Sequence, residues 1–68
     1  MTHAEVAKNM NDFELLEELI DSVVLRENAR AKYGHTRIWQ YYQNQSVAVA
    51  YKHELEDRLR NYANKESV

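Results

Sequence analysis

Apolar residues recur every three or four positions along two long stretches of the chain, which is the period of an α-helix. In the first stretch they are Phe13, Leu16, Leu19, Ile20, Val23, Val24 and Ala31. In the second stretch they are Ile38, Tyr41, Tyr42, Ala48, Val49, Leu55, Leu59 and Tyr62. Because this spacing gathers side chains on one helical face, the pattern predicts two long helices, over about 11–33 and about 36–64.

Polar residues mark where the predicted helices begin and end. Thr2 is followed three residues later by Glu5, which is typical of a capping box and predicts a short helix over about 2–8. Asn11 is expected to cap the second helix and Thr36 the third. The chain has no proline and one glycine, so Gly34 is the position marked for a left-handed helix end.

The short connection around Gly34 predicts that the two long helices turn back on each other as an antiparallel hairpin. In that register we expect Ile20 to face Val49 and Leu16 to face Leu55. A further apolar set falls outside this seam and makes both helices apolar on more than one side: Leu15, Leu25, Val47 and Tyr51. Such helices usually pack against more than one neighbour. We therefore expect an all-α fold, a helical hairpin with a short N-terminal helix, that dimerises into a four-helix bundle.

The composition narrows the class of protein. With 68 residues the chain is expected to form a single helical domain over 1–68, and a core this small favours association. Cysteine is absent, which excludes disulfides and thiolate zinc sites and favours a cytoplasmic location. No apolar run approaches the roughly 20 residues that cross a bilayer, so no membrane role is expected. The net charge of -2 gives no overall attraction to nucleic acid.

The sequence offers little catalytic chemistry. His3, His35 and His53 are scattered and do not share the spacing that places metal ligands on one helical face. No serine or threonine lies in a nucleophile motif, and there is no glycine-rich phosphate loop. We expect a protein that is not an enzyme and that uses no metal, no cofactor and no small-molecule substrate.

Glu27 and Gln45 occupy positions where the apolar stripes should continue. In the hairpin register they approach each other near Tyr41 and Tyr42. A carboxylate in such a place needs hydrogen bonds. We interpret the two residues as a buried polar contact that fixes the helix register or the oligomeric state.

Basic and aromatic residues gather at the turn end of the predicted hairpin, and Trp39 falls about one residue off the apolar stripe. Trp, Tyr and Arg are the residues most enriched at binding hot spots. The candidate partner-binding residues are Arg26, Arg30, Lys32, Tyr33, His35, Arg37, Trp39 and Tyr42. A structural alternative is that these rings finish the core while the cations complement a helix C-terminus.

The leading hypothesis is a homodimeric regulator or inhibitor that binds a partner protein, of the kind that phages and mobile elements encode. The first alternative is an RNA- or DNA-binding hairpin dimer, in which the cations contact phosphates and the rings stack on bases. The second is a structural or assembly adaptor. The acidic remainder of the surface argues against the nucleic-acid alternative.

Overall fold

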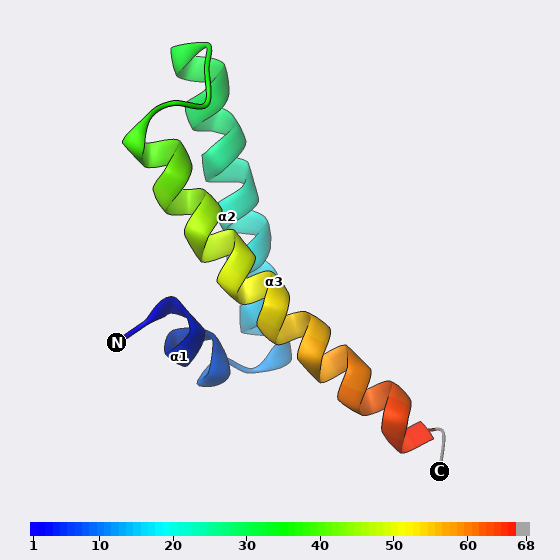
Figure 1. Cartoon of the computed structure of the whole chain (residues 1–68). Coiled ribbons are helices and arrows are strands. Elements are labelled where there is room, and N and C mark those ends of the chain that lie inside the picture. Colours follow the sequence, from blue (N-terminus) through cyan, green and yellow to red (C-terminus); the bar gives the residue numbers. More distant parts are fainter. Residues whose placement is uncertain (67–68) are drawn as a thin grey trace.

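The computed structural model describes residues 1–66, which form three helices (Figure 1). Helix α1 spans His3–Lys8, α2 spans Asp12–Tyr33 and α3 spans Trp39–Glu66. The two long helices pack antiparallel, and α1 packs against α3. The chain is elongated, with a radius of gyration of 14.0 Å, and the C-terminal turns of α3 extend past α2 (Figure 1). The predicted all-α hairpin with a short leading helix is confirmed.

The first two helices begin at the predicted caps. The hydroxyl of Thr2 accepts a hydrogen bond from the Glu5 backbone N–H at 3.2 Å and donates one to the Glu5 carboxylate at 3.1 Å. The side chain of Asn11 accepts from the Glu14 backbone N–H at 2.9 Å and donates to the Glu14 carboxylate. Each cap satisfies a backbone donor that has no partner within its own helix.

Helix α2 ends at Gly34, as expected. This glycine has φ 74° and ψ 7°, and its N–H donates to the Arg30 carbonyl at 2.8 Å. A left-handed residue at this place is favourable for glycine because it carries no Cβ. The chain therefore reverses direction directly after α2.

The predicted cap at Thr36 is wrong. Helix α3 begins at Trp39, and its first turn is closed by the Tyr42 N–H donating to the Ile38 carbonyl at 3.2 Å. The connection between the long helices is therefore longer than the sequence suggested. It places Thr36 and Arg37 in an exposed loop at the end of the hairpin.

The register along the two long helices agrees with the predicted one, since Arg26 bonds Gln45 and Asp12 bonds Arg58, but the predicted buried side of the helices is wrong. Leu16 and Ile20, expected in the seam, are exposed, whereas Leu15 and Tyr51, expected outside it, are buried. The core consists of Ala7, Leu15 and Tyr51, with Met10, Leu19, Val47, Ala50 and Leu55 packed against it. Ala7 of α1, Leu15 of α2 and Tyr51 of α3 share one buried cluster, so all three helices contribute to the core.

Small residues allow the long helices to approach each other farther along. Ser22 of α2 and Ala48 of α3 are both buried. The hydroxyl of Ser22 donates to the Glu18 carbonyl at 2.8 Å, so its burial leaves no unmet hydrogen bond. The result is a hairpin whose core lies near its middle and whose turn end is largely exposed.

Candidate functional site

Aromatic rings are exposed at the turn end of the hairpin. Trp39 opens α3 with 71% of its surface exposed, Tyr42 follows one turn later, and Tyr33 is the last residue of α2. All three rings remain exposed on either side of the connection between the long helices. Exposed large rings beside cations are typical of protein-binding surfaces.

All of the predicted partner-binding residues except Arg26 are exposed. We call them the tip surface: Arg30, Lys32, Tyr33, His35, Arg37, Trp39 and Tyr42. The Lys32 ammonium lies 5.4 Å from the centre of the Tyr33 ring, and Arg30 lies 3.4 Å from Glu27. Within residues 1–66 the Arg37 side chain has no acidic partner, and its backbone N–H donates to the His35 ring nitrogen at 3.1 Å.

Arg26 lies inside the hairpin and makes contacts within the chain. Its guanidinium donates to Glu27 at 2.9 Å and to the Gln45 side-chain oxygen at 2.6 Å, and it lies 5.9 Å from the centre of the Tyr41 ring. The Tyr41 ring in turn meets Tyr42 edge-on, with centroids 6.0 Å apart. Arg26 therefore supports the base of the tip surface and is poorly placed to contact a partner directly.

Glu27 and Gln45, predicted to meet, are joined through Arg26. Both residues are half-buried, and each accepts a hydrogen bond from the same guanidinium. The Arg26 hydrogen bond, with a smaller contribution from Arg30, lowers the pKa of the Glu27 carboxyl below its ordinary value. This bridge ties the middle of α2 to the first half of α3.

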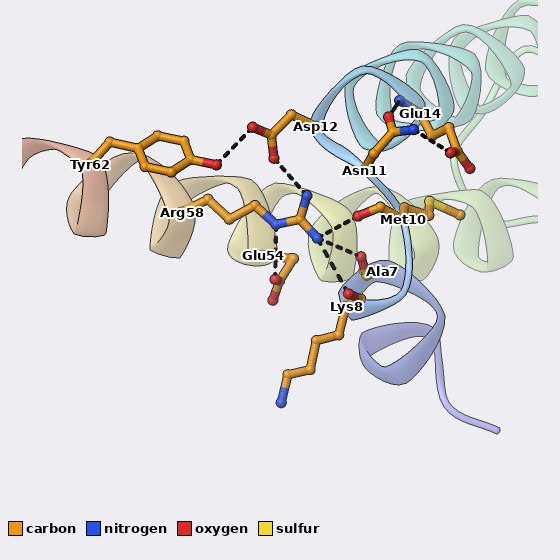
Figure 2. A network of polar contacts seen from close by, with 9 residues as sticks. All are labelled: Ala7, Lys8, Met10, Asn11, Asp12, Glu14, Glu54, Arg58 and Tyr62. Carbon is orange, nitrogen blue, oxygen red and sulfur yellow. Dashed lines mark hydrogen bonds and ion pairs between the residues drawn. The ribbon is translucent and has the colours of Figure 1, made fainter.

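A second polar cluster, which lies outside the candidate residues identified from the sequence, centres on Arg58 (Figure 2). Its guanidinium donates to Asp12 at 2.8 Å and to Glu54 at 3.1 Å. It also donates to the carbonyls of Ala7 and Met10 at 3.1 and 2.7 Å. Arg58 thus binds α1, the α1–α2 connection and the start of α2 from its place on α3.

Tyr62 completes this cluster, since its hydroxyl donates to the second Asp12 carboxylate oxygen at 2.7 Å. The hydrogen bonds from Tyr62 and Arg58 lower the pKa of the Asp12 carboxyl. The same contact raises the pKa of the Tyr62 hydroxyl, because loss of its proton would place a second negative charge beside Asp12. We call Asp12, Glu54, Arg58 and Tyr62 the Arg58 clasp. The four side chains form hydrogen bonds and ion pairs with one another, so the clasp stabilises the fold.

The described part of the chain holds no group of three His, Asp or Glu side chains placed to bind a metal ion. Among residues 1–66 no helix has the length and apolar character needed to cross a membrane. No protein-family model, no curated protein and no solved structure matches this chain.

Proposed function

We propose that this chain is a small non-enzymatic binding module that docks a partner protein through the tip surface. The observation that carries this proposal is the 71% exposure of Trp39 beside the exposed ring of Tyr42. A tryptophan exposed to this extent loses much unfavourable contact with water when a partner covers it. Arg37 and Lys32 add cations that fit an acidic rim around a partner's apolar pocket.

The mode of action proposed here is that of a regulator or inhibitor, which acts by occupying a surface of its target. The tip surface presents rings and cations on a rigid helix end, and rigid aromatic anchors give affinity with little loss of side-chain entropy. The Arg26 bridge supports this rigidity, because the guanidinium lies over the Tyr41 ring, which meets the Tyr42 ring edge-on. We also propose that two copies associate into a four-helix bundle, which would present two tip surfaces.

The test uses a tagged chain to capture a partner protein from extracts of the native host. The amount of partner captured by the wild-type chain is compared with the amounts captured by two double variants. Trp39→Ala with Arg37→Ala should abolish capture of the specific partner while the helical circular dichroism signal is unchanged. The matched control is Leu59→Ala with Arg60→Ala, which removes an exposed apolar and an exposed basic side chain near the other end of α3. This control should keep full capture. Equal capture by both variants would contradict the proposal.

A binding test with RNA and DNA separates the two classes of partner. If Arg30, Lys32 and Arg37 contacted phosphates, affinity should fall roughly 40-fold between 50 and 200 mM salt. An interface centred on Trp39 with a protein partner should change much less over that range. Suppose that the chain binds RNA or DNA with this steep salt dependence and that the Trp39 and Arg37 double variant does not bind. The partner of the tip surface would then be a nucleic acid and not a protein.

A further inference from the structure

Helix α2 carries a second apolar face that no other part of residues 1–66 covers. Phe13, Leu16, Ile20 and Val24 follow one another at three- or four-residue spacing, so they lie along one side of α2. All four are exposed, Phe13 at 82% and Ile20 at 53%. Leu15, Leu19 and Ser22 project toward the other helices from a different side. We call Phe13, Leu16, Ile20 and Val24 the outer stripe.

The accessible surface of the single chain is larger than that of a compact monomer, as expected if a second chain packs against it. The accessible surface is 5233 Å² for a mass of 8.1 kDa. A compact monomer of this mass exposes roughly 4,500 Å², so several hundred square ångströms are in excess. A standard protein interface covers roughly 800 Å² on each partner.

The charges of α2 are divided between its two halves. The first half contains Asp12, Glu14, Glu17, Glu18 and Asp21 and no Lys or Arg, and the second half contains Arg26, Arg30 and Lys32 with Glu27 as its acid. Within residues 1–66 Glu17, Glu18 and Asp21 form no ion pair. Glu27, which continues the stripe toward the tip, is already neutralised by Arg26 and Arg30.

From these observations we infer that the outer stripe packs against the outer stripe of a second copy, with the two α2 helices antiparallel about a two-fold axis near their centre. This arrangement covers Ile20 and Val24 of both copies at the middle of the interface. It also places the acidic half of each α2 beside the basic half of the other, so that Glu14 lies beside Lys32 of the partner subunit. A parallel pairing would instead set acidic halves side by side.

The inference deepens the proposed two-chain assembly, since it names the surface and the direction of packing. The bundle would contain α2 helices at its centre and α3 helices outside. The tip surface is not part of this contact, apart from Lys32 and Arg30 at its edge. Failure of partner capture and failure of dimerisation are therefore separate results.

The first experiment measures the mass of the full-length chain by light scattering and sedimentation equilibrium over a range of concentrations. We expect a dimer whose dissociation constant rises roughly 100-fold or more in Ile20→Glu, because a charge enters the interface from both copies. Leu25→Glu is the matched control, since Leu25 is equally exposed at 54% but lies off the stripe. It should remain dimeric. Helical circular dichroism should be retained in both variants, because neither side chain is buried within the hairpin.

The second experiment tests the direction of packing by exchanging charges. Glu14→Lys and Lys32→Glu should each weaken self-association several-fold, because each places like charges side by side. An equimolar mixture of the two variants should form a heterodimer of nearly the original affinity, since opposite charges then meet at both ends. A parallel dimer would show no loss in either single variant.

Three results would overturn the inference. They are a wild-type chain that stays monomeric at the highest attainable concentration, a dimer that Ile20→Glu leaves intact, and a mixture of charge variants that does not recover. The Trp39 and Arg37 double variant should dimerise normally. Its loss of capture together with an intact dimer would support the tip surface and the outer stripe as independent sites.

Discussion

The guanidinium of Arg58 lies 2.8 Å from the carboxylate of Asp12, and this ion pair joins the last third of α3 to the first turn of α2. The same guanidinium binds the carbonyls of Ala7 and Met10. The Arg58 clasp therefore holds α1 in the position where Ala7 closes the core. The apolar core is small, so this polar cluster contributes to holding α1 in place against α3.

Removal of Arg58 should destabilise the fold more than removal of any other cation on α3. Arg58→Ala leaves Asp12, Glu54 and two backbone carbonyls without their donor, and we expect the Tm to fall by roughly 5 °C or more. Arg60→Ala is the control, because Arg60 forms exposed pairs with Asp57 and Glu56 within its own helix. Thermal unfolding followed by circular dichroism checks both. An equal fall in Tm in the two variants would show that the Arg58 clasp stabilises the fold no more than an exposed ion pair does.

The Asp12 carboxyl should make stability depend on pH. Its pKa is lowered in the folded chain by Tyr62 and Arg58, so the unfolded chain binds more protons in acid. The stabilisation is present above the unfolded pKa of about 4 and is lost as the pH falls through the lower folded value. Asp12→Asn should therefore differ most from the wild type near neutral pH and approach it at about pH 2.

Urea unfolding of both proteins across this pH range measures the difference. Asp21→Asn is the control, since within residues 1–66 this carboxylate has no cation partner. A gap between the wild type and Asp12→Asn that stays constant from neutral to acid pH would show that ionisation of Asp12 does not stabilise the fold.

Two neighbouring leucines on α2 should respond very differently to truncation. Leu15 is fully buried, so Leu15→Ala should lower the free energy of unfolding by about 3 kcal/mol. Leu16 is exposed in the single chain, so Leu16→Ala should cost less than about 1 kcal/mol. Urea unfolding at a chain concentration low enough to keep the protein monomeric compares them. A larger loss for Leu16 would instead support the buried side of α2 that was predicted from the sequence.

Gly34 should be replaceable at a small cost. A Cβ at this position meets no atom within 4 Å, so any loss comes from the left-handed backbone, which has φ 74°. Gly34→Ala should lower the free energy of unfolding by about 1 kcal/mol, and Gly34→Asn by less, because asparagine tolerates this conformation better. Urea unfolding of the two variants gives the order. A loss of several kcal/mol in Gly34→Asn would mean that the turn needs glycine for another reason.

The amino-acid sequence alone determined the helices and the reversal between them. The side chains of Thr2 and Asn11 and the single glycine act on backbone groups within a few residues, so their effect is local and can be predicted from spacing. The exposure of Trp39 also followed from its place beside the apolar stripe. The start of α3 was predicted too early because Thr36 resembles a cap but does not act as one.

Only the tertiary structure decided which side of α2 is buried. The Leu15 side and the Leu16 side have similar apolar content, and helical periodicity alone does not choose between them. The Leu15 side is the one that shares a buried cluster with Ala7 of α1 and Tyr51 of α3, and Arg58 binds the carbonyls of Ala7 and Met10. These contacts join residues far apart in the sequence, and backbone carbonyl acceptors leave no signal in side-chain patterns. For the same reason the position of Arg26 beneath the tip surface required the structure.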